Sequence, residues 1–147
     1  MVIESIRSVL RNKGQEICSV APDATVYDAI ALMAAKSLAA VLVISEGTLL
    51  GIVSARDYGR KVILKGKSSK DVLVREIMTT SLVTVSPETT VLDAMALMTH
   101  HHIRHLPVLE EGKLDGVVSM ADLVSEVISG QAFTIDQLQA YIGHIPV

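Results

Sequence analysis

The sequence predicts an α/β (α+β) fold made of two tandem β-α-β-β-α repeats that pack as a pseudo-twofold pair. The first observation is an internal duplication, because Val20–Ile63 aligns with Val85–Ile128 without a gap and about 19 of the paired positions are identical. The second is that each repeat alternates helix-spaced apolar residues with short apolar runs bounded by turn residues. Each repeat alone lacks a complete core, so we expect the two to pack face to face with a ligand cleft between them.

Each repeat begins with a short strand and a turn that ends in threonine. The hydroxyl of Thr25 or Thr90 is placed to cap the helix that follows. Apolar residues then recur at helical spacing and form a stripe that should face the core. We expect strands at Ile17–Val20 and Leu82–Val85, helices at Val26–Lys36 and Val91–His101, and stripes of Val26, Ala29, Ile30, Met33 and Val91, Ala94, Met95, Met98.

The second half of each repeat predicts a β-hairpin followed by a helix. An apolar run too short for a helix precedes a Glu-Gly turn, and a second apolar strand follows it. We expect strands at Ala40–Ile44 and Leu49–Ser54 around Glu46-Gly47, their counterparts at His105–Leu109 and Leu114–Ser119 around Glu111-Gly112, and second helices at Arg56–Ile63 and Ala121–Ile128.

The segments outside the repeats predict two terminal helices and a linker. We interpret the terminal helices as lids on the pair or as dimer contacts, with docking of another protein as the alternative. The linker is polar and flexible by composition, and its end, Val74–Met78, leads into the second repeat. The parts are an N-terminal helix (1–14, with Ile3, Ile6, Val9 and Leu10 on one side and Gly14 at its end), repeat 1 (15–64), the linker (65–79), repeat 2 (80–130) and a C-terminal helix (131–147, from Thr134 to Gly143).

The composition limits the class of protein. Half of the residues are hydrophobic, but with one Phe, three Tyr and no Trp the core must be aliphatic. No apolar run approaches the ~18 residues of a membrane helix and no signal-peptide core is present, so we expect a cytoplasmic protein outside the membrane. The single cysteine, Cys18, excludes an internal disulfide and a cysteine-based zinc site. A net charge of −3 disfavours nucleic acid as a partner, although the basic stretch from Lys61 to Arg75 keeps that alternative open.

Four histidines lie close together in the second repeat, but they do not predict a metal site. Consecutive histidines point in different directions, and this stretch runs from a helix end into a strand without an accompanying Asp, Glu or Cys cluster. Catalysis is not predicted either, because the chain has no Walker motif, no Gly-x-Gly-x-x-Gly and no spaced nucleophile, base and acid. The histidines are His100, His101, His102 and His105.

A Gly-x-x-Ser-x-x-Asp segment joins the hairpin of each repeat to its second helix. The helix start offers free N–H groups and a serine hydroxyl to an anion. One turn later, Asp57 or Asp122 can accept two hydrogen bonds from a ribose diol. The same spacing is close to a capping box, in which the serine and the acid satisfy the donors of the helix itself. The pattern alone therefore leaves ligand binding and capping open.

The chain resembles the cystathionine-β-synthase (CBS) domain family over about residues 15 to 130. The resemblance rests on Gly-Ile-Val-Ser-Ala-Arg-Asp (51–57) and Gly-Val-Val-Ser-Met-Ala-Asp (116–122), on Thr-Val-x-x-Ala opening each first helix, on Leu-Pro-Val in the second repeat, and on Val-Arg-Glu-Ile-Met-Thr (74–79). It is similar to stand-alone CBS-pair proteins, also called Bateman modules.

This resemblance implies a non-enzymatic regulatory module that senses adenosine-containing nucleotides in the cleft between the repeats. It also implies a homodimer that acts on a downstream protein. AMP is the expected ligand, with ATP, ADP, NAD and S-adenosylmethionine as alternatives, and no cofactor is required. The alternative function is a structural protein that docks a partner through its terminal helices.

The resemblance further implies two unequal sites, each combining the Ser/Asp motif of one repeat with the first strands of the other. The first site holds two arginines and a histidine, so it should bind phosphate and fill first, with a pH dependence near the ordinary histidine pKa of ~6.5. The second nearly lacks positive charge and should be weaker. The first comprises Ser54, Arg56, Asp57, Val83, Ile103, Arg104 and His105, and the second comprises Cys18, Ala39, Ala40, Ser119 and Asp122.

Overall fold

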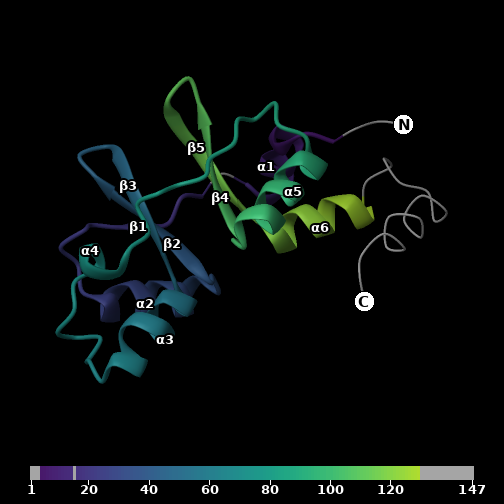
Figure 1. Cartoon of the computed structure of the whole chain (residues 1–147). Coiled ribbons are helices and arrows are strands. Elements are labelled where there is room, and N and C mark those ends of the chain that lie inside the picture. The colour runs from purple at the N-terminus through teal and green to yellow at the C-terminus, as the bar shows by residue number, and fades with distance from the viewer. Residues whose placement is uncertain (1–3, 15, 130–147) are drawn as a thin grey trace, which may run out of the picture. The chain divides into compact units, whose positions relative to one another are not determined.

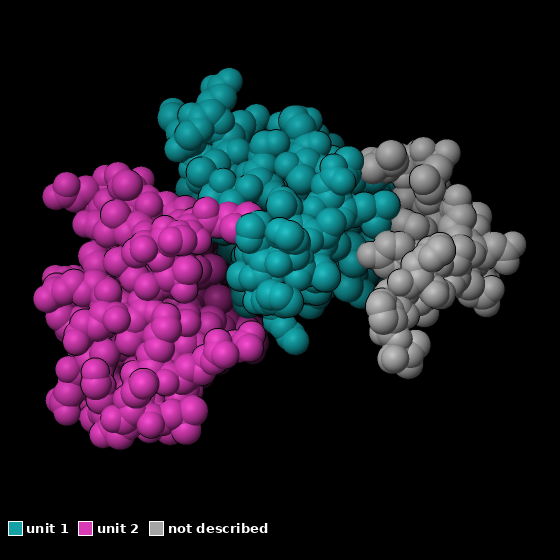
Figure 2. Space-filling model, viewed as in Figure 1, with its two compact units in different colours: residues 1–15, 84–147 teal, residues 16–83 magenta. Residues whose placement is uncertain are grey.

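A computed structural model describes residues 4–14 and 16–129 of the chain (Figure 1). The chain falls into two units, coloured separately in Figure 2: unit 1 comprises residues 1–15 and 84–147, and unit 2 comprises residues 16–83. Unit 2 contains β1 (Ser19–Val20), α2 (Val26–Lys36), β2 (Ala40–Ser45), β3 (Thr48–Ser54), α3 (Ala55–Lys61), the 3₁₀ turn η1 (Ile63–Lys65) and α4 (Val74–Ile77). Unit 1 contains α1 (Ile6–Lys13), α5 (Val91–His101), β4 (His105–Glu110), β5 (Lys113–Ser119) and α6 (Met120–Ser129).

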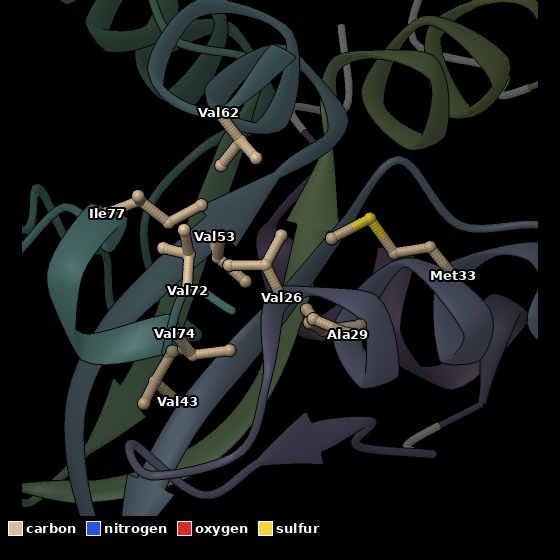
Figure 3. Close-up of a cluster of buried hydrophobic side chains, with 10 residues drawn as sticks. Val26, Ala29, Met33, Val43, Val53, Val62, Val72, Val74 and Ile77 are labelled. Atoms are coloured by element: carbon tan, nitrogen blue, oxygen red, sulfur yellow. The ribbon is translucent and has the colours of Figure 1, made fainter. Parts of the chain in front are cut away.

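Unit 2 is a three-stranded sheet in the order β1-β2-β3 with helices packed against it. β1 runs parallel to β2, and β2 pairs antiparallel with β3 so that Ala40 lies opposite Ser54. The hairpin turn puts Glu46 and Gly47 at φ 51° and 76°, the left-handed conformation that a two-residue turn requires. The apolar side chains gather into an aliphatic core (Figure 3), formed by Val26, Ala29, Met33, Val41, Val43, Val53, Val62, Val72, Val74 and Ile77.

The first helix of each repeat has the predicted bounds and the predicted cap. The Thr25 hydroxyl accepts a hydrogen bond from the Asp28 N–H at 3.1 Å, and Thr90 does the same for Asp93. Such a cap satisfies one of the backbone donors that a helix start leaves free. In both helices the first, fourth and eighth residues are buried, whereas Ile30 and Met95 of the predicted stripes are only half-buried.

Unit 1 repeats this hairpin, with β4 antiparallel to β5 and His105 opposite Ser119. The predicted strand at Leu82–Val85 is wrong: Val85 makes a single isolated parallel bridge to Val108. Its N–H donates to the Pro107 carbonyl and its carbonyl accepts from Leu109, and the pairing does not extend beyond that residue into a strand. The predicted Ile17–Val20 strand is likewise shorter, at Ser19–Val20, and α3 ends at Lys61 because the chain then tightens into η1.

Each repeat is completed by a short segment that precedes the other repeat in the chain. We call residues 4–10 and 72–78 the lead-in segments; residues 4–10 lie in unit 1 with repeat 2, and residues 72–78 lie in unit 2 with repeat 1. The sequence predicts that Val74–Met78 leads into the second repeat, but its backbone hydrogen bonds join it to the first. Three backbone hydrogen bonds attach each segment, and they correspond between the units. In unit 1 they run from Val91 N–H to Glu4 O, from Ile6 N–H to Thr89 O and from Arg7 N–H to Pro87 O. In unit 2 their counterparts run from Val26 N–H to Val72 O, from Val74 N–H to Ala24 O and from Arg75 N–H to Pro22 O.

The two lead-in segments also pack in equivalent ways on the hairpins. A Cβ added at Gly51 would lie 2.7 Å from the Thr79 carbonyl oxygen and 3.1 Å from Met78 Sδ. A Cβ added at Gly116 would lie 2.8 Å from a Leu10 methyl group. Glycine is therefore required at Gly51, where the Thr79 backbone lies against the strand, whereas at Gly116 an added methyl group would meet only the flexible end of Leu10.

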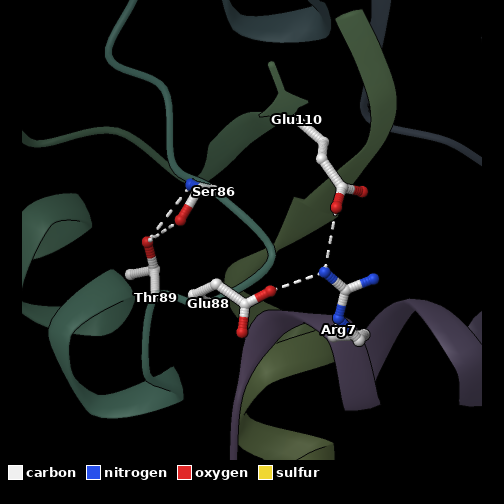
Figure 4. A network of polar contacts seen from close by, with 5 residues as sticks. All are labelled: Arg7, Ser86, Glu88, Thr89 and Glu110. Atoms are coloured by element: carbon white, nitrogen blue, oxygen red, sulfur yellow. Dashed lines mark hydrogen bonds and ion pairs between the residues drawn. The ribbon is translucent and has the colours of Figure 1, made fainter.

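Exposed ion pairs add to the attachment of α1 within unit 1 (Figure 4). The Arg7 guanidinium donates to Glu88 at 2.5 Å and to Glu110 at 3.1 Å. Close by, the Ser86 N–H donates to the Thr89 hydroxyl at 3.1 Å. Because the side chains of Arg7, Glu88 and Glu110 are largely exposed, we expect these ion pairs to contribute little to stability.

The predicted C-terminal helix (131–147) lies outside the described residues. Among the helices that the structure does describe, none combines the length and apolar character needed to cross a bilayer.

Candidate functional site

In unit 2, the Ser/Asp motif forms a reciprocal capping box at the junction of β3 and α3. The Asp57 N–H donates to Ser54 Oγ at 3.1 Å, and Asp57 Oδ2 accepts the Ser54 N–H at 2.9 Å. Asp57 Oδ1 pairs with Lys61 Nζ at 3.2 Å, and the same ammonium donates to the Ile77 carbonyl at 2.8 Å. The capping interpretation is therefore correct for these residues, and the carboxylate is held in one orientation.

In unit 1, Ser119 and Asp122 form the same reciprocal pair at the junction of β5 and α6. The Asp122 N–H donates to Ser119 Oγ at 3.1 Å, and Asp122 Oδ2 accepts the Ser119 N–H at 2.8 Å. The cation here comes from α1: Lys13 Nζ lies 2.7 Å from Asp122 Oδ2 and donates to the Val117 carbonyl at 2.9 Å. Lys61 and Lys13 thus form ion pairs with the corresponding carboxylates of Asp57 and Asp122, although the two lysines do not occupy equivalent positions in the repeats.

The strand opposite each motif differs between the units. In unit 1, His105 is the register partner of Ser119, and the Arg104 carbonyl accepts the Met120 N–H at 2.9 Å. In unit 2 the corresponding residues are alanines: Ala40 pairs with Ser54, and the Ala39 carbonyl accepts the Ala55 N–H. The motif in unit 1 therefore has more charged and titratable neighbours within its own unit.

Two pKa shifts mark the motif in unit 1. Burial lowers the pKa of His105 below its ordinary value, the Asp122 charge opposes this, and Lys13 and Arg104 lower the pKa further. Burial pushes the pKa of Asp122 upward, but the hydrogen bonds from Lys13 and Ser119 and the lysine charge outweigh it and leave the pKa lowered. At neutral pH the site thus holds a carboxylate, an ammonium and a neutral imidazole.

These findings correct two sequence-based expectations. The surroundings of Ser119 and Asp122 do not lack positive charge, because Lys13 contacts the carboxylate directly. His105 carries its proton only at a lower pH than expected, because its pKa is depressed.

Sequence reasoning missed Lys13, because this residue lies far from the motif in the chain and carries no local signal for it. A similarity between the two lead-in segments could have revealed that α1 belongs with repeat 2. Both have the same pattern of apolar residues around an arginine: Ile6, Arg7, Val9 and Leu10 in one, and Val74, Arg75, Ile77 and Met78 in the other.

The remaining predicted site residues are placed only within their own units. Arg56 is exposed next to the capping box of α3, Val83 is half-buried at the end of unit 2, and Ile103 is half-buried just before β4. Cys18 is partly buried beside β1, and its carbonyl accepts the Leu42 N–H at 3.1 Å. The expected combination of residues from both repeats stays a prediction.

The histidines end a helix. His100 and His101 form the last turn of α5, and His102 follows in the left-handed conformation at φ 55°. Across the described part of the chain, no group of three or more His, Cys, Asp or Glu side chains is placed to hold a metal ion.

The two motifs can act as oriented acceptors with a cation beside each. A carboxylate fixed by its backbone bonds can accept hydroxyl hydrogens without first losing conformational freedom, and the adjacent ammonium can donate to an anion. A ligand that carries both hydroxyl groups and a negative charge fits this chemistry. A nucleophile with an adjacent base is not part of either motif.

Comparisons with known proteins agree on one family. The model of the CBS domain matches residues 8–61 and 74–129. The CBS domain-containing protein CBSX3, mitochondrial, from Arabidopsis thaliana is 40% identical over 149 residues, which is 94% of this chain and 71% of that protein. The CBS domain-containing protein YhcV from Bacillus subtilis is 31% identical over 117 residues, which is 80% of this chain and 83% of that protein.

Solved structures give the same result. A protein with CBS domains from Burkholderia ambifaria is 46% identical with a TM-score of 0.83, and the match covers 89% of this chain and 98% of that one. A hexameric CBS-CP12 protein from bloom-forming cyanobacteria is 28% identical with a TM-score of 0.76, over 97% of this chain and 85% of that one.

Proposed function

This chain belongs to the CBS domain family, and we propose that it is a non-catalytic regulatory module that binds an adenosine-containing nucleotide. The observation that carries the proposal is the pair of fixed carboxylates, Asp57 and Asp122, each held by a serine and accompanied by a lysine. An enzyme usually needs dissimilar groups with separated pKa values. Two like motifs in like positions are better suited to binding.

The chemistry of a nucleotide matches the groups available. Its ribose diol can donate to a carboxylate, and its phosphate can accept from Lys13, Arg56 or Arg104. The capping bonds do not exclude this role, because a carboxylate has about four acceptor positions and the cap occupies only part of them. AMP is the first candidate, and ATP, ADP, NAD and S-adenosylmethionine share the adenosine moiety.

Binding would regulate only if the nucleotide prefers one conformation or assembly of the protein. We propose that the assembly is a homodimer and that its geometry responds to the ligand. Exposed apolar side chains on both units support an association surface: Ile63 and Leu64 in unit 2, and Val124 and Ile128 on α6 in unit 1. The CBS-CP12 relative is described as a hexamer, so a larger assembly is the alternative to the homodimer.

A thermal unfolding screen tests the proposed function. AMP, ADP, ATP, NAD and S-adenosylmethionine at millimolar concentration are added to the purified full chain, with inorganic phosphate as the control for a general anion effect. We expect at least one nucleotide to raise the melting temperature more than phosphate does, because a ligand that binds only the folded state stabilises it. If none of them does, the protein is better explained as a structural module that docks a partner.

We propose the cytoplasm as the compartment of this protein, with the mitochondrion as the alternative. The low cysteine content and the apolar pattern led us to expect the cytoplasm, and the Arabidopsis relative is named as mitochondrial. Fluorescence microscopy of the tagged chain in its own cells would distinguish the two.

A further inference from the structure

We propose that Lys13 of the N-terminal helix is a ligand-binding residue of the Asp122 motif and makes that motif select nucleotides over nucleosides. This inference rests on the proposed function and assigns its anion contact. It replaces the expectation from the sequence that the motif of repeat 2 lacks positive charge and prefers a ligand with little charge.

Among the described residues, two of the three N–H groups of Lys13 have protein acceptors, which leaves one donor for a ligand. An ammonium has three N–H groups, and two of them are directed to Asp122 Oδ2 at 2.7 Å and to the Val117 carbonyl at 2.9 Å. The side chain of Lys13 is 32% exposed, so the third N–H can reach a group arriving from solvent. Its two protein bonds fix the position of the charge, which lowers the entropy cost of using it.

Asp122 offers a complementary acceptor next to this donor. Both bonds that its carboxylate accepts within the described residues end on Oδ2, one from Ser119 and one from Lys13. Oδ1 therefore remains available to a hydroxyl hydrogen of a ligand. A sugar hydroxyl on Oδ1 and a phosphate oxygen on Lys13 would satisfy both groups together.

The other charges of unit 1 near this motif also favour an anion. Arg104 lies on the strand side of the junction, where its charge acts on His105, and Lys13 acts on the same imidazole. The carboxylates on this side of α6 are Asp122, which pairs with Lys13, and Glu126, which is already held by Ser8 and Asn12 of α1. A neutral nucleoside would use only the carboxylate, whereas a nucleotide would use both kinds of group.

The motif of repeat 1 is built differently. Lys61, which pairs with Asp57, lies on the same helix as its partner and donates another hydrogen bond to the Ile77 carbonyl. Lys13 instead belongs to α1, so an anion bound to it also ties that helix to the rest of unit 1. Ligand binding should therefore protect the backbone of α1.

The test compares AMP with adenosine in the full chain carrying Asp57→Ala, which removes the carboxylate of the other motif. Calorimetry measures both affinities with Lys13 present, with Lys13→Met and with Lys13→Arg. We expect Lys13→Met to weaken AMP binding about tenfold, the effect of one lost charge-assisted hydrogen bond, and to leave adenosine within about twofold. Lys13→Arg should restore most of the AMP affinity, because it keeps the charge.

A matched control removes a lysine of the same kind elsewhere. Lys36→Met breaks the exposed ion pair with Glu16 at 3.0 Å and should change neither affinity. Equal losses for AMP and adenosine in Lys13→Met would overturn the proposal. Tighter adenosine binding would also overturn it, because it would show that Lys13 competes with the ligand. Absence of binding by either compound to the unsubstituted chain would instead count against the proposed function.

A second measurement does not depend on the folding of a variant. Hydrogen exchange of the unsubstituted chain is followed in the amides of α1 and in the Gly14 N–H directly after it, which donates to the Leu10 carbonyl. At saturating ligand, AMP should slow their exchange more than adenosine does. Equal protection by the two compounds would contradict a phosphate contact at Lys13.

Discussion

Lys61 of α3 and Glu126 of α6 occupy equivalent positions in the two repeats but carry opposite charges. Lys61 donates to the Ile77 carbonyl at 2.8 Å, whereas Glu126 accepts from Ser8 Oγ at 3.2 Å and from Asn12 Nδ2 at 3.0 Å. Each residue thus joins the second helix of its repeat to the helix of the lead-in segment, in opposite donor and acceptor roles. The duplicated fold has kept the contact and changed its chemistry.

Glu126 gives the first prediction, because it is a buried charged residue with 8% exposure. Glu126→Ala should lower the free energy of unfolding by about 1–3 kcal/mol, because it leaves the Ser8 and Asn12 donors unpaired. Urea denaturation measures this loss, and Asp115→Ala serves as a control at an acid of β5 in the same unit. A loss no larger than that of the control would show that the α1 contact contributes little.

The two hairpin glycines give a second prediction. Gly51→Ala should cost about 1–3 kcal/mol of stability, the range for overpacking, because the new methyl group meets the Thr79 backbone oxygen. Gly116→Ala should cost less, because Leu10 presents only the end of a flexible side chain. Thermal and urea unfolding of both variants would reveal the order, and the reverse order would contradict the packing described for the lead-in segments.

Asp57 is predicted to have two roles that can be separated. Asp57→Ala should lose about 1 kcal/mol of stability, as the loss of a helix cap does, and should also weaken nucleotide binding by about 1.5–3 kcal/mol. Thr25→Ala, which removes a cap away from the motif, should lose similar stability and keep the affinity. If Asp57→Ala behaves like Thr25→Ala in both measurements, Asp57 is a capping residue only.

His105 predicts a pH dependence of stability. The pKa of His105 in the folded protein is lowered from its ordinary value of 6.5. Between the folded-state pKa and the unfolded-state pKa, the unfolded chain binds more protons than the folded chain does, so stability falls as the pH falls. The contribution is fully present above about pH 6.5. The charged groups that act on it are Asp122, Lys13 and Arg104, and Asp122 stays ionised across this window because its own pKa is lowered.

Urea unfolding at pH 7.5 and pH 5.5 measures this effect. The decrease in stability between the two values should be smaller in His105→Gln than in the unsubstituted protein. An equal decrease in both would mean that other groups cause the pH dependence.

The duplication and the apolar spacing predicted most of the fold. The bounds of α2 and α5, both hairpins and both threonine caps followed from local patterns that tertiary packing did not override. The strand before α5 was not predictable in this way, because Val85 forms a bridge through only one residue. The exchange of the lead-in segments depends on long-range backbone bonds, which spacing within a repeat does not reveal.

The candidate site was predicted in part. The Ser-x-x-Asp motifs could be located because their spacing has a local meaning at a helix start. Their cations could not be paired with them from the sequence, because Lys13 reaches Asp122 from a helix more than a hundred positions earlier. The depressed pKa of His105 arises from burial, which depends on the folded packing.

The most direct test of the account is calorimetry of AMP binding to the unsubstituted chain and to the Asp57→Ala/Asp122→Ala double variant. The account predicts saturable binding to the unsubstituted chain. It predicts that the double variant loses at least about a hundredfold in AMP affinity, because each substitution removes hydrogen bonds between a carboxylate and the ligand. Circular dichroism establishes that the variant remains folded. Unchanged AMP affinity in a folded double variant would show that the paired carboxylates do not form the nucleotide site.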